Sequence, residues 1–478
     1  MKVNEQTGIV KAMAEHWVII SSLLSGTAGM RKNKALLPKW PNEEDNAYNA
    51  RLAVATLLPA LKRTIMVMVG KPFSKELTLG DDVPTIIEEY CQDINLEGQS
   101  LHSFSIQVFD EVMSYGLCGI LVDFPVAPVA TEGRVRTVAD EKAMKLRPYF
   151  TFVKHGQILG WRTRRIDGAL TLTQLRIMEE VEEDDGAFGT ACIPQVRVLE
   201  PGRWATYRES GEGALREWKL FEEGVTTLTY IPFIPFYGKR LAYMVGESPL
   251  QDLAYLNVKH WQSQSDQDTI LHVARVPILA IIGAEAAGPD GKGGTQLVVG
   301  ASAGVKLPMD ADMKYVEHTG KAIEAGAQSL KDLEDQMVQT GAELLVVKPG
   351  DKSATEANNE AEANKSDLQR IGENFEDSMD QSLQVMADWL KQPEGGHIQL
   401  FKDFGSFLLS DASAQLVLQM QQSGLLTKET ALTEMQRRGV ISPDIDPADE
   451  LVKAEEEGPE LGAAGIDPAT GLPRVAEE

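Results

Sequence analysis

SPLQDLAYLNVKHWQSQSDQDTILHVA, residues 248–274, opens the stretch of sequence that decides the fold. Its first four residues are a helix start, because serine caps a helix, proline is tolerated at the first position and glutamine completes a capping box. The pattern predicts a helix that runs to about Ala274 and ends before Pro277. Its middle, QSQSDQD, is polar on every side. We therefore expect this helix either to line solvent or to pack against copies of itself through hydrogen bonds.

A small β module is predicted between Pro277 and about His318. The segment contains the apolar runs ILAII and TQLVVG, the segment GVKLPMD and the glycine-rich GPDGKGG. These fit a few short strands with a flexible loop. The glycines do not make a phosphate-binding loop, because no Gly-Lys pair is followed by Ser or Thr at the required offset.

Two further helices follow this module. The first spans about Lys321 to Thr340, and Gly341 is expected to supply a left-handed residue at its end. After AELLVVKPGDKS, a new helix start at Ser353, with Glu356 as its box partner, predicts one helix from 354 to 391. At 1.5 Å per residue it would be roughly 55 Å long. Its apolar heptad persists for barely three repeats, which favours a single spine over a coiled coil.

The part before residue 248 divides into helices and a sheet. Apolar spacing predicts a helix over 5–25, a second from about Glu43 that Pro59 kinks or divides, and a third over Leu101–Tyr115. The apolar run GLCGILVDF after it predicts a buried strand. From Pro148 to Tyr237 the period changes towards two, which predicts an antiparallel sheet packed on the N-terminal helices.

Two charged clusters lie in this β-rich region. The acidic cluster is expected at a hairpin tip, where solvation is favoured over metal binding. The basic cluster is expected to pair with neighbouring acids, with a phosphate contact as the alternative. The acidic residues are Glu179, Glu180, Glu182, Glu183, Asp184 and Asp185, and the basic ones are Arg162, Arg164 and Arg165.

The composition limits the classes of function that this chain can have. The 478 residues predict two to four modules, and the formal charge of -25 argues against sequence-specific DNA binding, which takes clustered Lys and Arg. It does not exclude a protein that touches DNA without gripping it. The three cysteines, Cys91, Cys118 and Cys192, have no metal-ligand spacing and predict buried reduced thiols. No membrane span or secretory signal is predicted, so we expect assembly in the cytoplasm.

The sequence provides no catalytic constellation. No HExxH pair, GxSxG elbow or GxGxxG turn is present, so no catalytic, cofactor-binding or metal-binding residue is predicted and the chain is not expected to be an enzyme.

In combination, several segments resemble the portal proteins of tailed bacteriophages, specifically a group long catalogued as phage proteins of unknown function. The resemblance covers about residues 10–440. The matching segments are MRKNKALLPKWPNEEDNAYNARL (30–52), VGKPF (69–73), GLCGILVDFP (116–125), YGKRLAYMVGESPLQDLAYLNVKHWQSQSD (237–266) and the paired-helix block through Leu390.

The resemblance implies an α+β, portal-like fold with named parts. These parts would be a wing (1–247), stem helix 1 (248–274), a β-containing clip (275–320), stem helix 2 (321–340), a tunnel loop (341–353), a long spine helix returning to the wing (354–404), a helical crown (405–457) and a flexible acidic tail (458–478).

The implied function is a ring of copies, usually twelve, at one capsid vertex, through which double-stranded DNA is packaged and ejected. The implied partners are the terminase large subunit, which hydrolyses ATP, then the head–tail adaptor, and the major capsid and scaffolding proteins, with no membrane. The particle would assemble in the host cytoplasm. A ring of such acidic subunits would carry on the order of -300 charges, which repels phosphate and lets DNA slide.

Two sets of residues follow from the implied parts. In the tunnel loop, Lys348 and Lys352 would meet the DNA backbone transiently while Leu344, Leu345 and Val346 pack against neighbouring loops; alternatively both lysines solvate a turn. In the clip, the residues expected to contact motor or adaptor are Ile281, Lys292, Val298 and Lys306.

Two other classes of function stay open. A capsid-associated structural or adaptor protein that forms no channel would not need residues 248–274 and 321–340 to lie side by side with the β module at their far end. A carboxylate-based hydrolase in the β-rich region would need a concave pocket with convergent acids.

Overall fold

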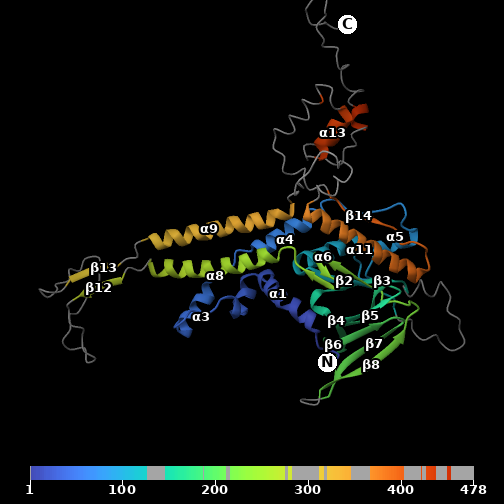
Figure 1. Cartoon of the computed structure of the whole chain (residues 1–478), viewed down its shortest axis with the longest axis horizontal. Helices are drawn as coiled ribbons and strands as arrows, with labels where there is room; N and C mark the ends of the chain where they lie inside the picture. The colour runs from blue at the N-terminus through green and yellow to red at the C-terminus, as the bar shows by residue number, and fades with distance from the viewer. Residues whose placement is uncertain are drawn as a thin grey trace, which may run out of the picture. The chain divides into compact units, whose positions relative to one another are not determined.

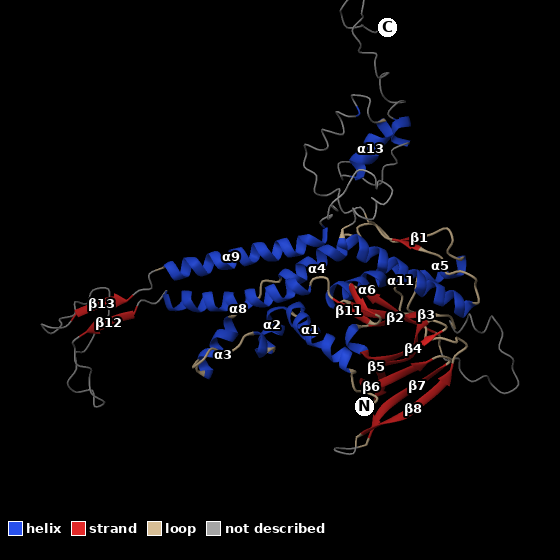
Figure 2. Cartoon of the chain, viewed as in Figure 1, coloured by secondary structure: helices blue, strands red, loops and turns tan. Residues whose placement is uncertain are grey.

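The structure is a computed structural model, and it divides into two units, Met1–Phe401 and Lys402–Glu478, which are described separately. The described residues are 2–125, 146–186, 188–211, 216–274, 278–282, 312–316, 320–345, 366–402, 421, 427–437 and 449–453. Helices and sheets are both present in the first unit, which confirms the α+β class (Figures 1 and 2).

The N-terminal helices have the expected breaks. Gly26, at φ +71°, separates the first two, and Pro59 lies between the third and fourth. Thr7 caps the first helix by accepting from the Val10 amide. The four helices are α1 (Gly8–Leu24), α2 (Gly26–Lys32), α3 (Asp45–Val54) and α4 (Ala60–Gly70), with a 3-10 turn, η1 (Lys34–Leu36), between α2 and α3.

A three-stranded antiparallel sheet, in the order β3-β2-β9, forms the centre of the first unit. Its middle strand, β2 (Leu117–Asp123), is buried from Leu117 to Val122, which explains the unbroken apolar run in its sequence. The helices α6 and α11 pack on this sheet and meet each other at Phe109 and Phe375. The other elements are α5 (Thr85–Cys91), α6 (Leu101–Tyr115), β3 (Tyr149–Val153), β9 (Phe233–Tyr237) and α11 (Asp367–Leu390).

Most of the period-two region forms a five-stranded antiparallel sheet in the order β4-β5-β6-β7-β8, while its first and last strands, β3 and β9, belong to the central sheet. Its turn at Asp167-Gly168 has φ values of +50° and +84°, as a type I′ turn requires and as the Asp-Gly pair predicts. Side chains of α1, including Trp17, share a core with Leu175 and Leu199 of this sheet, which confirms packing on an N-terminal helix. The strands are β4 (Ile158–Ile166), β5 (Ala169–Asp185), β6 (Gly189–Glu200), β7 (Arg203–Ser210) and β8 (Glu217–Val225), with η2 (His155–Gln157) before β4.

The two charged clusters match expectation only in part. The six acidic residues lie in β5 and run up to the β5–β6 hairpin turn, where Asp184 and Asp185 are exposed as expected, whereas Glu179 and Glu183 pair with Arg197 and Arg208. The three arginines, Arg162, Arg164 and Arg165, lie exposed on β4 and form no ion pair with another described residue, so the predicted pairing with acids is wrong.

The first unit also contains two short antiparallel strand pairs. Strand β1 (Thr78–Leu79) pairs with β14 (Ile398–Gln399), and β10 (Lys239–Ala242) pairs with β11 (Val245–Glu247). Gly116, at φ +79°, ends α6 where the Glu247 carbonyl approaches; a Cβ there would lie 2.3 Å from that oxygen. Only glycine satisfies both the backbone conformation and this approach.

The spine helix starts later than predicted. Helix α11 begins at Asp367, and its N-cap Ser366 is extended and forms a capping box with Gln369. A single helix over 354–391 is therefore wrong, because Ser366, rather than Ser353, supplies the cap. Residues 354–365 lie outside the described residues. The apolar rhythm that the sequence shows from Leu368 onwards is the part that is buried.

In the second unit, the structure describes helix α13 (Lys428–Arg437) and helical residues 449–453. The Thr427 hydroxyl accepts from the Thr430 amide at 3.1 Å, which confirms Thr427 as the cap. The predicted helix SDASAQLVLQMQQSGLL (410–426) and the tail after 453 lie outside the described residues, apart from Gln421.

Candidate functional site

A pair of helices joined through a two-stranded β module forms the candidate site. Helix α8 (Gln251–Ala274) and helix α9 (Lys321–Ala342) lie side by side (Figure 1). Strands β12 (Ile278–Ile282) and β13 (Asp312–Val316) pair antiparallel between them in the chain. The structure thus contains the helix adjacency that a conduit needs, which an adaptor could also have. We call these elements the stem hairpin (α8 with α9) and the β module (β12 with β13).

The polar side of α8 is buried within its own chain. Asn257 is fully buried; it accepts from the Leu61 amide and donates to the Leu58 carbonyl at the start of α4. His260 lies 3.2 Å from Glu334 of α9, and Gln267 donates to the Ile323 carbonyl at 3.0 Å. The expectation that this face lines solvent or meets copies of itself is therefore wrong for these residues. Backbone and side-chain partners from α4 and α9 bond to these three side chains instead. On the same helix, His260 Nδ1, Trp261 Nε1 and Ser265 Oγ are buried without a hydrogen-bond partner among the described residues.

Helix α9 contributes a narrow apolar stripe. Leu330, Leu333 and Met337 are buried, as the spacing predicts, whereas Ala327 is exposed. Gly341 does not end the helix in the left-handed conformation, so that prediction is wrong. The helix continues to Ala342. Glycine at 341 instead permits close contact with α4, since a Cβ there would lie 3.1 Å from the Thr64 methyl group.

Glycine also sets the separation of the two stem helices. A Cβ on Gly326 of α9 would lie 2.1 Å from the Gln267 oxygen, so glycine leaves room for the hydrogen bond between Gln267 and Ile323. The outer face of α9 remains exposed and carries mixed charge. The two stem helices together contain three lysines and seven acidic residues. The hairpin is therefore acidic and would repel a phosphate backbone more than it attracts one.

The structure locates some of the predicted site residues. Ile281 lies in β12, in register with Met313 of β13. Leu344 is buried and Leu345 is partly buried in the 3-10 turn η4 (Glu343–Leu345). The other predicted site residues lie outside the described residues: Lys292, Val298, Lys306, Val346, Lys348 and Lys352.

Asn257 was missed by the sequence reasoning. The polar run within its helix predicted only that the helix is polar. The partners of Asn257 are backbone groups almost two hundred residues away in the chain. An asparagine near the middle of a helix is a weak signal, because the same residue is also found on solvent-facing surfaces.

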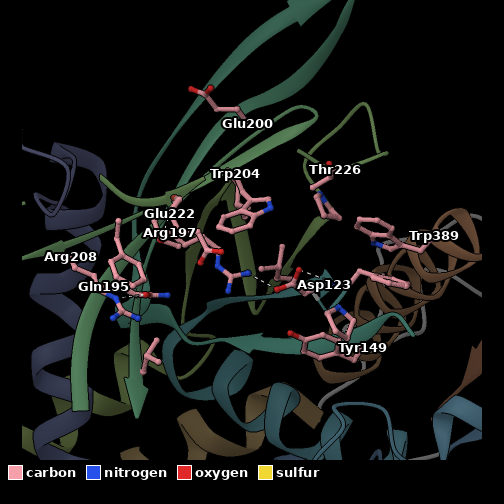
Figure 3. A pocket seen from close by; sticks show the side chains of 18 residues that line it. Asp123, Tyr149, Gln195, Arg197, Glu200, Trp204, Arg208, Glu222, Thr226 and Trp389 are labelled. Carbon is pink, nitrogen blue, oxygen red and sulfur yellow. Dashed lines mark hydrogen bonds and ion pairs between the residues drawn. The ribbon is translucent and has the colours of Figure 1, made fainter. Parts of the chain in front are cut away.

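A pocket in the β-rich region bears on the hydrolase alternative. A cavity of about 290 Å³ lies among the five-stranded sheet, the central sheet and α11 (Figure 3). Its carboxylate Asp123 pairs with Arg197, whose Nε lies 2.8 Å from Glu179. Burial alone lowers the pKa of Arg197, but Glu179 and Asp123 outweigh it and raise that pKa above its ordinary value.

Arg208 and Tyr149 also line this pocket. Arg208 is bonded to Gln195 and pairs with Glu183. Burial raises the pKa of Tyr149 to about 12, which keeps its phenol protonated at neutral pH. The network around Arg197 is thus a structural junction held by paired charges, while two further carboxylates, Glu200 and Glu222, also line the cavity.

Other chemistry is not indicated in the described part of the chain. No group of three His, Cys, Asp or Glu side chains there could hold a metal ion. Burial raises the pKa of the Cys91 thiol to about 12 and that of Cys118 well above its usual value, so both stay protonated. Cys192 is exposed, contrary to the prediction of three buried thiols. None of the described helices has the length and apolar character to cross a bilayer.

Comparison with known proteins gives one family match and several distant structural likenesses. Residues 249–390, under a third of the chain, match the model of a family described as a domain of unknown function, DUF4055. The match spans the stem hairpin, the β module and α11. No curated protein matches the chain in sequence.

The similar structures are chains from gene transfer agent (GTA) particles. One, from the neck of the native GTA particle computed with C12 symmetry, is 14% identical, with a TM-score of 0.38, covering 78% of this chain and 89% of that one. Another, from the neck of the empty particle computed with C6 symmetry, is 16% identical, with a TM-score of 0.38, covering 79% and 89%. A third, from the native virion, is 14% identical with a TM-score of 0.37, covering 78% and 89%. At these TM-scores the likeness carries no argument for fold or function.

Proposed function

We propose that the chain is a structural protein of a phage-like particle and, more specifically, its portal: a ring of copies, with twelve expected, around a channel for double-stranded DNA at one capsid vertex. The single observation that carries the proposal is the stem hairpin with its β module. Two adjacent helices hold a small β module at one end and are packed against α1 and α4 at the other.

The charge of the hairpin supports a conduit. A channel wall that attracted phosphate strongly would stall DNA, whereas an acidic wall leaves only weak and transient contacts. We assign residues 248–274 and 321–340 to the stem, 275–320 to the clip, 341–353 to the tunnel loop, 354–404 to the spine, 405–457 to the crown and 1–247 to the wing. In this scheme the clip meets the terminase motor and later the tail adaptor.

The chain's own role is geometric rather than catalytic. Among the described residues no group of side chains could hold a metal ion, and Asp123 in the β-rich pocket is paired with Arg197. ATP hydrolysis would belong to the terminase large subunit. The virion is the expected location, with the capsid and scaffolding proteins as neighbours.

A second candidate, an adaptor or capsid-associated protein without a channel, is favoured by one observation. Asn257, His260 and Gln267 find partners within the chain, so the polar face of α8 does not by itself require neighbouring copies. A ring is then needed to explain the exposed face of α9 and the β module, but not the buried face of α8.

Electron microscopy of the purified full-length protein separates these candidates. Negative-stain images and mass photometry over a range of concentrations are expected to show closed rings with a central hole. A protein that stays monomeric at every concentration, and is also monomeric when recovered from the producing cells, contradicts the portal proposal and leaves the adaptor as the better account.

A further inference from the structure

Within the described part of the chain, the five-stranded sheet has two edges that no further strand covers. Its order, β4-β5-β6-β7-β8, leaves β4 and β8 each paired on one side only. Part of the β4 edge is covered, because the Thr7 amide donates to the Leu159 carbonyl at 2.9 Å. From Arg162 to Ile166 the strand is exposed. An open strand edge of this kind is a template for pairing with another chain.

The odd number of strands fixes how two such sheets could join. Neighbouring strands are antiparallel throughout, so β4 and β8 run in the same direction. Copies related by a small rotation, as in a ring, keep their sheets in similar orientation. The β8 edge of one copy would therefore meet the β4 edge of the next in a parallel ladder.

The two edges carry opposite charge. Strand β4 has three exposed arginines and no acid, whereas β8 has three exposed glutamates, Glu217, Glu222 and Glu223, and one lysine, Lys219. Glu223 lies 3.5 Å from Arg203, and both side chains are more than half exposed, so this pair is weak. The arginines of β4 form no ion pair with any described residue. The charge on each edge is thus complementary to the charge on the other.

Apolar side chains accompany the charges. On β8, Leu220, Phe221 and Val225 are 51%, 56% and 86% exposed, and Ile166 on β4 is 45% exposed. Exposed apolar residues at an open strand edge favour pairing with another strand. The charge on the same edge decides which kind of edge can pair with it. A β8 edge would repel another β8 edge and attract a β4 edge.

We propose that β4 of one copy and β8 of the next form a head-to-tail interface between copies of this chain. Arg162, Arg164 and Arg165 face Glu222 and Glu223 in the last part of β8 across it. Because its two sides differ, the contact is heterologous and closes into a ring rather than a symmetric dimer. The inference rests on the proposed ring and names the surface through which its copies join.

A charge swap tests the interface in the full-length protein. One variant carries Arg162→Glu, Arg164→Glu and Arg165→Glu, and a second carries Glu217→Lys, Glu222→Lys and Glu223→Lys. Each is expected to raise the protein concentration for half-maximal ring formation at least tenfold, measured by mass photometry and negative-stain imaging. The combined six-fold variant restores opposite charges and is expected to recover most of the assembly.

A matched control changes the same amount of charge on an inner strand. Glu182→Lys, Asp184→Lys and Asp185→Lys alter three exposed acids of β5 that are not on an edge. This variant should assemble like the unmodified protein. Circular dichroism and thermal melting establish that every variant is folded before its assembly is compared.

A backbone variant tests the ladder separately from the charge. In a two-residue hairpin the closing pair, Ile166 and Ala169, is hydrogen-bonded, so alternate residues such as Thr163 point their backbone groups out of the sheet. Thr163→Pro removes one outward N–H, which an edge strand tolerates. It is expected to weaken assembly without changing the melting temperature by more than a few degrees.

The outcomes separate this inference from the proposed function. Rings in the unmodified protein and in every variant overturn the interface and leave the portal proposal intact. Absence of rings from the unmodified protein overturns both. If the arginine variant forms normal rings but retains less DNA than the control, the arginines contact phosphate and the interface proposal is wrong.

Discussion

The central sheet and the stem hairpin are held together by different forces. In the central region, Phe375 of α11 makes ring contacts with Phe73, Phe109 and Phe236, and hydrophobic burial supplies the stability. In the stem hairpin, buried amides and a histidine join α8 to α4 and α9. Hydrophobic packing in the central region tolerates small shifts of the helices against the sheet, whereas the hydrogen bonds of the stem hairpin fix the position and register of α8 against α4 and α9. The hairpin is therefore built for placement more than for stability.

The largest expected effect is on the central region. Phe375→Ala removes the ring at which α6, α11 and β9 meet and should lower the free energy of unfolding by about 3–5 kcal/mol. Urea denaturation followed by tryptophan fluorescence measures the change. Phe188→Ala is the matched control, because Phe188 is fully exposed and should change stability by less than about 0.5 kcal/mol. Equal losses from the two variants would contradict the core described for α11.

The next effect tests the joint between the hairpin and α4. Asn257→Ala leaves the Leu61 amide and the Leu58 carbonyl buried without partners, which should cost about 1–3 kcal/mol. Hydrogen exchange should accelerate at the start of α4 more than in β2. Gln264→Ala is the control, since Gln264 bonds only to Asp268 of its own helix. A loss confined to global stability, with no local exchange change at Leu61, would count against a positioning role.

A smaller effect tests the spacing within the hairpin. Gln267→Ala removes the bond to Ile323 and should cost about 0.5–1.5 kcal/mol. Gly326→Ala should destabilise the unmodified protein, because its Cβ would meet the Gln267 side chain, but should stabilise the Gln267→Ala variant through higher helix propensity. A double-mutant cycle measured by thermal unfolding reads out this change of sign. The same sign in both backgrounds would show that the two residues do not share the space.

The smallest effect concerns the exposed pair Asp82 and His397, which joins the β1 loop to β14. The hydrogen bond to His397 lowers the pKa of Asp82, and the hydrogen bond to Asp82 raises the pKa of His397. The stabilising contact is therefore present between these two values. It is lost as pH falls through the lowered pKa of Asp82 or rises through the raised pKa of His397.

Hydrogen exchange at the Gly80 amide, which donates to the His397 carbonyl, should report this window. Protection is expected to decline as pH rises past the histidine pKa, after correction for the intrinsic rate. His397→Gln should flatten the profile and leave protection in β2 unchanged. A profile that keeps its shape in this variant would assign the pH dependence to another group.

The elements that the sequence predicted well are those whose signals are local. Helix α6 has the predicted bounds, and the turn at Asp167-Gly168 has the predicted backbone, because capping, periodicity and positive φ each depend on a few neighbouring residues. The start of α11 was predicted at the wrong serine. Both Ser353 and Ser366 have a box partner three residues later, and the local pattern cannot rank them.

The candidate site was predictable in outline and not in detail. The order of helix, β module and helix follows from periodicity and glycine placement, and it alone suggested the stem hairpin. The partners of Asn257, Gln267 and Arg197 did not follow, because they come from segments far away in the chain. Gly341 shows the same limit: its sequence position favours a helix end, but the approach of α4 explains why glycine is there.

The sequence by itself determined the α+β class, the buried strand β2, the stem hairpin and the acidic balance, because each depends on composition or on spacing along the chain. Only the tertiary structure decided that Asn257, His260 and Gln267 of α8 find partners inside one chain, and that the arginines of β4 form no ion pair with another described residue. The physical reason is that hydrogen bonds and ion pairs need partners at about 3 Å, and which groups come that close is set by the packing of distant elements.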